Sequence, residues 1–532
     1  MKFTISTWAA VGASLLVASC GGGGGGGSAG TQNSTPARGE LMQSPPPRIT
    51  SLSAADYNAR LIASATGQSL LTLSTGSATG SVPCGVDVQY LKYGTVGGKD
   101  EATTASAALM VPTGTDPKCT GARPIVMFAH GTTVEKRYNL ADFTDTTNPA
   151  YGQAQLLASL FAAQGYIVVA PNYAGYDSSS LSYHPFLVAA QQSKDMIDAL
   201  AAAKTALPTL ISGVTASTKL FITGYSQGGH VAMATHKALQ DAGVTVTASA
   251  PMSGPYALGL YGDAVVGGKV PAGSTTLIPM LINAYQKTYG TLYTAPTDYY
   301  ESTYAAGMEA AFPGSYTSTT LVTGGVVPQL TLFNSTEPTG FVGAGITPPT
   351  TGTAGQNALW AAGFGTANLL KNSLRTAYLA DSVGNPSTAG GTIAPATPAH
   401  PLRVAAKTND FRSWTGPTRP MLLCGGSSDP TVYYSANTSI MAAIWAAQVT
   451  ARVVTELDVD SATARTDGFE GARQGFRAAL AKVQTDAATA AATAGGDATA
   501  QATAAGQATL AYYHSGVAPY CTAAARGFFS NF

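Results

Sequence analysis

Uninterrupted apolar runs alternate along the chain with segments that repeat apolar residues every three to four positions. The runs, which are typical of strands buried on both faces of a parallel sheet, lie at 124–129 (PIVMFA), 166–170 (YIVVA) and 420–424 (PMLLC). Two further strands are predicted at 220–223 and at 244–250, where polar residues interrupt the apolar ones. Helical spacing occupies 153–164, 191–206 and 229–242. Apolar and polar residues alternate on both sides of a Gly-Gly-Lys-Asp turn, which predicts two further strands over 86–112. This order predicts right-handed β-α-β crossovers and a mostly parallel sheet.

The alternation stops between Leu258 and about His400. An insertion here would lie over the carboxyl ends of the strands, where ligands bind in open α/β sheets. We therefore expect a cap over 259–400 between two parts of a core, 51–258 and 401–532. Six cap tyrosines either line an acyl or aromatic pocket or pack the cap against the core: Tyr285, Tyr289, Tyr293, Tyr299, Tyr300 and Tyr304.

An Ala- and Thr-rich segment at about 479–510 interrupts the second part of the core. Its Gly495-Gly496 step predicts a turn between two helices. No chemistry is assigned to this segment.

The chain carries 28 basic and 28 acidic residues among 532, and no cluster of Lys and Arg. A protein that follows a phosphate backbone needs such a cluster, so nucleic-acid binding is excluded.

The first residues resemble an export signal. Lys2 precedes an apolar run at 8–17 that is too short to span a bilayer. Val-Ala-Ser-Cys at 17–20 resembles a bacterial lipobox, which makes 1–20 a lipoprotein signal and Cys20 the lipidated residue that attaches the protein to the membrane. The composition of 21–50 predicts a flexible tether. Gly21, which is not aspartate, points to the outer membrane or cell surface; the alternative is a plain secretory signal and a periplasmic or secreted protein.

Export permits disulfides. Four cysteines remain besides Cys20, and they allow three pairings. We favour Cys84–Cys119, which would clamp the early strands, and Cys424–Cys521, which would join two segments argued below to be catalytic. Free buried thiols are the alternative.

Candidate chemistry begins at GYSQG, residues 224–228, which fits the G-x-S-x-G nucleophile elbow. In this motif the serine stands where a strand turns sharply into a helix, and the glycines let the two approach closely. The pattern arises by chance in a chain with 60 glycines, but here a buried run precedes it and helical spacing follows. Ser226 is therefore the candidate nucleophile.

A serine nucleophile needs a base, and the base needs an orienting acid. In one common order the serine comes first, the acid second and the histidine last. Of six histidines, only His514 follows a good acid site, and we expect the stretch around it, 511–516, to form a loop. The acid predicted is Asp429, at the end of a Gly/Ser loop after the run at 420–424. Asp458 and Asp460 are the fallback acids, and Asp410 is weaker because it precedes the strand.

An oxyanion needs two fixed N–H donors. The residue after the nucleophile, Gln227, supplies one. The second is predicted from the loop after the first buried run, with Thr132 as first choice and Gly131 next. His130 in this loop is interpreted as ordering the loop rather than as a base.

Several stretches together resemble the secretory lipase family and its bacterial lipase and esterase relatives within the α/β-hydrolase superfamily. They are AHGTT (129–133), GYIVVAPNYAGY (165–176), GYSQGGH (224–230), APMSGPYAL (250–258) and NDFRSWTGPTRPMLLCGGSSDPTV (409–432). The resemblance implies an α/β-hydrolase fold, with a mostly parallel sheet, helices on both faces and an inserted, largely helical cap. It also implies Ser226, Asp429 and His514 as catalytic residues, no metal or organic cofactor, and a small-molecule, lipid or polymer ester as substrate. Two features depart from the family: Asn172, where many relatives have Asp, and the Ala/Thr-rich insertion.

The sequence thus predicts an exported serine ester hydrolase. The rivals are a serine peptidase or acyltransferase on the same fold, and a non-catalytic hydrolase-like surface lipoprotein.

Overall fold

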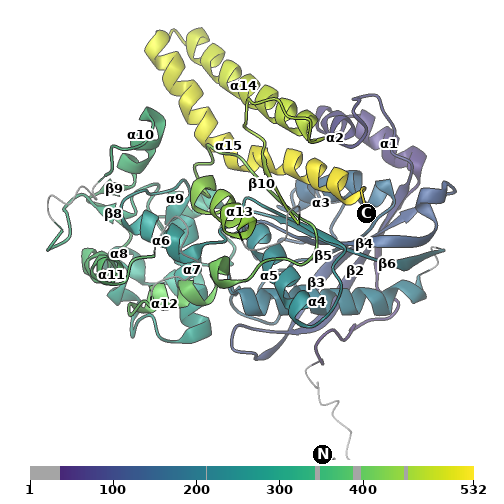
Figure 1. The fold of residues 1–532 in the computed structure, drawn as a ribbon, viewed down its shortest axis with the longest axis horizontal. Coiled ribbons are helices and arrows are strands. Elements are labelled where there is room, and N and C mark those ends of the chain that lie inside the picture. The colour runs from purple at the N-terminus through teal and green to yellow at the C-terminus, as the bar shows by residue number, and fades with distance from the viewer. Residues whose placement is uncertain (1–35, 211–212, 342–347, 388–396, 448–452) are drawn as a thin grey trace, which may run out of the picture. The chain divides into compact units, whose positions relative to one another are not determined.

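The structure, a computed structural model, describes residues 36–210, 213–341, 348–387, 397–447 and 453–532. Its main element is a nine-stranded sheet with parallel pairing from β5 onward and antiparallel pairing at the β1–β2–β3 end (Figure 1). The strands, in spatial order, are β1 (Arg48–Leu52), β2 (Gly85–Val96), β3 (Ala102–Thr113), β5 (Ile167–Pro171), β4 (Gly121–Ala129), β6 (Val214–Tyr225), β7 (Ala248–Met252), β10 (Met421–Gly425) and β11 (Val454–Asp458). The predicted mostly parallel sheet is confirmed.

Helices cover both faces of this sheet, as predicted (Figure 1). One face carries α4 (Ala189–Ala206), α5 (Gln227–Asp241) and α13 (Thr438–Ala446), and the other carries α1 (Ala54–Ile62), α2 (Ala65–Thr75), α3 (Tyr151–Leu160) and α15 (Ala498–Phe529). α14 (Glu470–Thr493) pairs with α15 through the turn at Gly495-Gly496. Burial on both faces explains why the central strands are continuous apolar runs.

A second hydrophobic cluster lies in the inserted segment. Its helices are α6 (Leu258–Val266), α7 (Ser274–Tyr289), α8 (Ser302–Ala305), α9 (Ser318–Thr323), α10 (Ala354–Ala362), α11 (Asn372–Gly384) and α12 (Pro401–Thr408), beside the short strands β8 (Phe333–Asn334) and β9 (Phe364–Gly365). The cap extends past the predicted boundary at 400, because Leu402, Ala405 and Ala406 of α12 pack into this cluster.

The predicted tether is wrong for residues 36–50. Leu41 bridges Tyr93 of β2, Arg38 forms an ion pair with the nearly buried Asp198, and β1 pairs with β2 at the sheet edge. These residues satisfy backbone groups of an edge strand, which a composition rich in Ser and Pro does not reveal. The proposed signal and Cys20 lie outside the described residues.

Four of the six histidines are buried in the core. Burial lowers the pKa of His184 to about 3, and it lowers the pKa of three others to about 4: His130, His230 and His236. In the unfolded chain a histidine has a pKa of about 6.5. The unfolded state therefore binds protons that the folded state excludes, and stability is lost as the pH falls from about 6.5 toward 4.

We therefore predict that the protein unfolds at a lower temperature at pH 5 than at pH 7.5. Each buried histidine contributes a loss on the order of 1–2 kcal/mol at pH 5. Asp195 opposes them, because burial raises its pKa to about 7 and protonation relieves the cost of its charge. Burial also raises the pKa of Asp198. The two carboxyl groups offset only part of the loss from the four histidines. Thermal unfolding followed by circular dichroism checks this, and Asp195→Asn should steepen the acid loss; equal Tm values at both pH values would contradict it.

Candidate active site

Ser226 stands between the last residue of β6 and the first residue of α5, with φ 60° and ψ −122°. A non-glycine residue with this backbone is strained and persists only where its surroundings impose it. The two glycines of the motif allow close approaches: a Cβ on Gly224 of β6 would lie 2.3 Å from the Gly228 oxygen of α5, and one on Gly228 would lie 2.0 Å from the oxygen of Ala129 at the end of β4. The predicted elbow is present.

His514, which lies 288 positions further along the chain, contacts this serine. Its Nε2 lies 2.8 Å from Ser226 Oγ, and its Nδ1 lies 2.7 Å from Asp429 Oδ2. The three side chains that the sequence singled out are thus in one hydrogen-bonded chain. The prediction that His514 lies on a loop is wrong, because it is part of α15. Tyr513 and Val517 on that helix are buried against the core, and this packing holds the segment helical despite Gly516.

Asp429 follows β10 in the loop where it was expected. Its side chain is 1% exposed, and its Oδ1 accepts the backbone N–H groups of Thr431 and Val432 at 2.9 and 3.0 Å. Oδ2 is left to accept Nδ1–H of His514. Because Nδ1 then carries the proton, the lone pair of Nε2 faces the serine hydroxyl, which is the tautomer a general base requires.

The other candidate acids bind elsewhere. Asp458 accepts the Ser427 N–H at 3.0 Å, and Asp460 accepts the Tyr513 hydroxyl at 2.6 Å. Asp410 is buried in an ion pair with Arg412. Asp458 and Asp460 therefore brace the loop that carries the acid.

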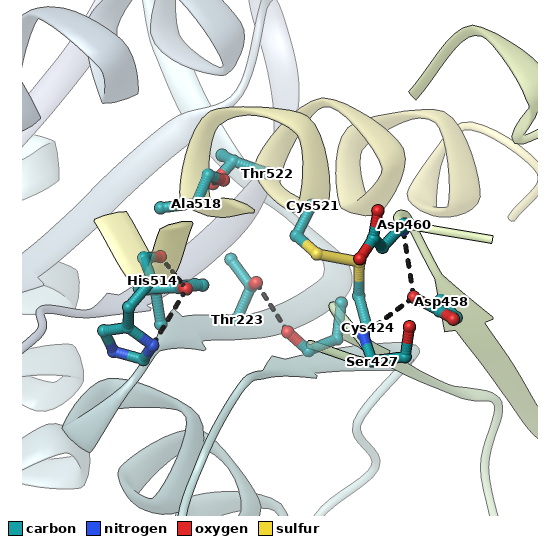
Figure 2. The surroundings of a disulfide bond; sticks show 11 residues. Thr223, Cys424, Ser427, Asp458, Asp460, His514, Ala518, Cys521 and Thr522 are labelled. Atoms are coloured by element: carbon teal, nitrogen blue, oxygen red, sulfur yellow. Dashed lines mark hydrogen bonds between the residues drawn. A yellow bond between two sulfur atoms is a disulfide. The ribbon is translucent and has the colours of Figure 1, made fainter. Parts of the chain in front are cut away.

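A disulfide joins the two segments that supply acid and base. Cys424 in β10 is bonded to Cys521, seven residues after His514 on α15, and Figure 2 shows this bond beside Asp460 and below the helix. The Cys84–Cys119 bond is also present. Both favoured pairings therefore occur. The Cys424–Cys521 bond fixes the helix of His514 to the strand that leads to Asp429.

The predicted oxyanion donors lie beside the serine. A Cβ on Gly131 would be 3.7 Å from Ser226 Cβ, and Thr132 lines both cavities described below together with Ser226. Within the described part of the chain, neither the Thr132 nor the Gln227 backbone N–H has an acceptor. Gln227 is the first residue of α5, whose initial N–H groups lack intrahelical partners. Two unpaired donors thus flank the nucleophile.

His130 orders this loop. Its Nδ1 lies 2.6 Å from the Gly131 carbonyl oxygen and its Nε2 lies 3.1 Å from the Asn172 carbonyl oxygen. Burial lowers its pKa to about 4, so it is neutral. The Gly131 oxygen and the Thr132 N–H belong to one peptide plane and point in opposite directions.

Sequence reasoning missed Tyr225. Its hydroxyl donates to the His514 carbonyl oxygen, and its ring centroid lies 5.1 Å from that of the imidazole. It occupies a variable position of the elbow motif, so no sequence signal marks it.

Two cavities open at Ser226. One has a volume of about 630 Å³ and lies against α15; the other has a volume of about 80 Å³ and lies against α6 and α7. None of the six cap tyrosines lines either one, and four of them are buried in the cap cluster, so in the described structure they pack rather than form a pocket. Residues 36–532, where described, hold no cluster of three side chains able to bind a metal ion.

Comparison with known proteins gives a family match over part of the chain and two similar solved structures. The model of the prolyl oligopeptidase family matches residues 153–255, which contain the elbow. The rice cell wall degrading esterase LipA from Xanthomonas oryzae is 26% identical with a TM-score of 0.60, over 80% of this chain and 91% of that one. A putative hydrolase from Legionella pneumophila is 17% identical with a TM-score of 0.57, over 79% and 91%, and shows the fold alone. No curated protein sequence matches.

Proposed function

We propose that the chain, an α/β hydrolase of the lipase and esterase kind with a serine-hydrolase core, is a carboxylic-ester hydrolase. It acts through Ser226, His514 and Asp429. The observation that carries the proposal is the chain of two hydrogen bonds from Ser226 Oγ through the imidazole to a buried carboxylate. The similarity to the Xanthomonas oryzae esterase LipA supports an ester substrate.

The reaction follows from these contacts. Ser226 Oγ attacks the ester carbonyl carbon while its proton passes to His514 Nε2, and Asp429 stabilises the imidazolium. The carbonyl oxygen becomes an oxyanion that accepts the Gln227 and Thr132 N–H groups. The C–O bond to the alcohol then breaks, and the alcohol leaves with the proton from Nε2. Water, deprotonated by His514, attacks the acyl-enzyme, releases the acid and restores Ser226.

A serine peptidase is the second candidate, because the prolyl oligopeptidase model matches the segment that carries the nucleophile. The amine that leaves from an amide is a poorer leaving group than the alcohol that leaves from an ester. The same triad serves both reactions, so geometry alone does not separate them.

A location outside the cytosol is part of the proposal. The two disulfides support an oxidising compartment. No helix in the described ranges is long and apolar enough to cross a bilayer. Attachment through a lipid on Cys20 stays a prediction from the sequence.

The test combines labelling with substrate choice. A fluorophosphonate probe should label the wild-type protein, and peptide mapping should place the label on Ser226. The protein should hydrolyse 4-nitrophenyl butyrate faster than peptide 4-nitroanilides. Faster turnover of the anilides would favour the peptidase, and absence of labelling would contradict a serine hydrolase mechanism.

A further inference from the structure

One aromatic cluster contacts both segments that supply the oxyanion donors. Its members are Tyr173, Tyr176 and His184, which lie between β5 and α4 and are buried. The imidazole of His184 stacks on the Tyr173 ring with centroids 5.5 Å apart, and its centroid lies 4.7 Å from that of Tyr176. Both tyrosines belong to the GYIVVAPNYAGY stretch, which has no role in the reaction described above.

The two tyrosines hold the loop that carries Thr132. Tyr173 donates its hydroxyl to the His130 carbonyl oxygen at 3.0 Å, and Tyr176 donates its hydroxyl to the Thr133 carbonyl oxygen at 2.6 Å. These carbonyl groups lie on either side of Thr132 in the chain. The peptide that presents the Thr132 N–H is therefore fixed on both sides, and its direction does not depend on an acceptor of its own.

His184 holds the residue that supplies the other donor. Its Nδ1 lies 2.9 Å from the Ala174 carbonyl oxygen, which can only accept, so Nδ1 carries the proton. Burial lowers the pKa of His184 to about 3, so the ring is neutral and Nε2 is an acceptor. The Gln227 side-chain Nε2 lies 2.6 Å from that atom and donates to it. The side chain that follows the nucleophile is thus anchored to the aromatic cluster.

This anchor acts where the helix gives its own backbone little support. Gln227 is the first residue of α5, whose initial N–H groups lack intrahelical partners. Such an N–H stabilises an oxyanion only while it points at the place where the negative charge forms. The bond to His184 restricts the Gln227 side chain and, through the shared Cα atom, the N–H of the same residue.

The cluster is itself held in place by a buried carboxyl group. Asp195 of α4 accepts the Ala174 N–H at 2.6 Å and the Tyr93 hydroxyl at 2.8 Å. The backbone of Ala174 is therefore bonded at its N–H by Asp195 and at its carbonyl oxygen by His184. A continuous series of hydrogen bonds thus leads from the interior of the sheet to the side chain of Gln227.

We propose that His184 is a positioning residue of the oxyanion hole: through the Gln227 side chain it directs the Gln227 N–H toward the developing oxyanion, while Tyr173 and Tyr176 hold the loop of Thr132. The inference rests on the ester-hydrolase function proposed above. It gives the cluster a part in stabilising charge and none in transferring the proton.

Gln227→Met removes the anchor and keeps the backbone N–H. We expect kcat for 4-nitrophenyl butyrate to fall about tenfold with KM within about twofold of the wild type, because the N–H acts on the transition state. Complete loss of an oxyanion donor costs about 10²- to 10³-fold, and a misdirected donor costs less. The affinity for 1,1,1-trifluoropentan-2-one, whose adduct with Ser226 carries the oxyanion, should fall by the same factor. The pH at which kcat/KM is half-maximal should stay, since His514 keeps its partners.

A second variant tests whether His184 acts through Gln227. His184→Phe keeps an aromatic ring beside the tyrosines and removes the acceptor of the Gln227 amide. It should also lower kcat about tenfold, and the double variant should lose no more than about twofold beyond either single variant, because both changes break one contact. Gln192→Met is the matched control, since the Nε2 of this buried residue approaches the same His184 atom at 3.4 Å. It should keep kcat within about threefold of the wild type.

The outcomes separate this inference from the proposed function. The positioning role is overturned if Gln227→Met keeps the wild-type kcat and inhibitor affinity, or shifts the pH midpoint instead. It is also overturned if the two single losses multiply in the double variant, or if Gln192→Met loses as much. Ester hydrolysis stands in each of these cases. If the wild type hydrolyses no ester, both proposals fall. Should His184→Phe fail to fold by circular dichroism, Gln227→Met and its control still decide.

Discussion

Ser226→Ala is expected to lower kcat for ester hydrolysis by a factor of about 10⁴ to 10⁶. Alanine removes the oxygen atom that bonds the acyl group. Among the described contacts, the hydroxyl within hydrogen-bond distance of His514 Nε2 is that of Ser226, at 2.8 Å. Residual turnover would come from water activated by the histidine and from the two oxyanion donors. Hydrolysis of 4-nitrophenyl butyrate and fluorophosphonate labelling measure the loss.

A neighbouring serine provides the control. Ser515 is exposed, follows His514 on α15 and donates its hydroxyl to the Tyr512 carbonyl oxygen. Ser515→Ala should reduce kcat by less than about tenfold, as an exposed substitution does. The Tm of Ser226→Ala should stay close to that of the wild type, because alanine keeps the strained backbone of the elbow. If Ser226→Ala keeps more than a tenth of the wild-type activity, Ser226 is not the nucleophile.

The central strands and the elbow could be predicted because burial leaves a direct mark on sequence. A parallel strand covered on both faces must be apolar throughout, as in β4 and β5. The approach of α5 to β6 excludes a side chain at Gly224, and its approach to the end of β4 excludes one at Gly228. These constraints are local and therefore readable. The chain order of serine, acid and histidine then limited the remaining choice to one histidine.

The helix of His514 could not be read as easily, because Ser515 and Gly516 are weak helix formers. A signal was present nonetheless: Tyr513, Val517 and Cys521 are spaced four residues apart, and all three are buried. That spacing marks one face of a helix. Tertiary packing against the sheet, together with the disulfide, outweighs local propensity here.

The contacts of residues 36–50 have no comparable signal. Arg38 pairs with Asp198, which is 160 positions away, and Leu41 bridges Tyr93. Each contact depends on where the chain enters the sheet edge, which composition does not encode. The same is true of the two cavities at Ser226, since Leu281 of α7 lines one and Ala511 of α15 lines the other, from elements that are far apart in the sequence.

Asp429→Asn is expected to lower kcat by about 10⁴-fold, although the change leaves the shape of the side chain intact. The reason lies in the backbone around it. Thr431 and Val432 both donate their N–H groups to Oδ1, so an asparagine must turn its carbonyl oxygen toward them. Its NH₂ group then faces His514 Nδ1, which lies 2.7 Å from that position in the wild type. To accept this donor, Nδ1 must lose its proton, and the proton moves to Nε2. Nε2 can then no longer take the proton of Ser226.

The matched control is Asp460→Asn, which alters one of the two fallback acids beside the loop that carries Asp429. Asp460 accepts the Tyr513 hydroxyl, and an asparagine carbonyl oxygen can accept it equally well. We expect less than about a tenfold loss in kcat for this variant, as for other changes that leave the reacting groups paired. Phosphonate labelling should slow in Asp429→Asn and not in Asp460→Asn, because it reports the base-activated serine directly. Equal losses in the two variants would show that Asp429 is not the residue that sets the tautomer, and that the carboxylates act only by holding the loop beside His514.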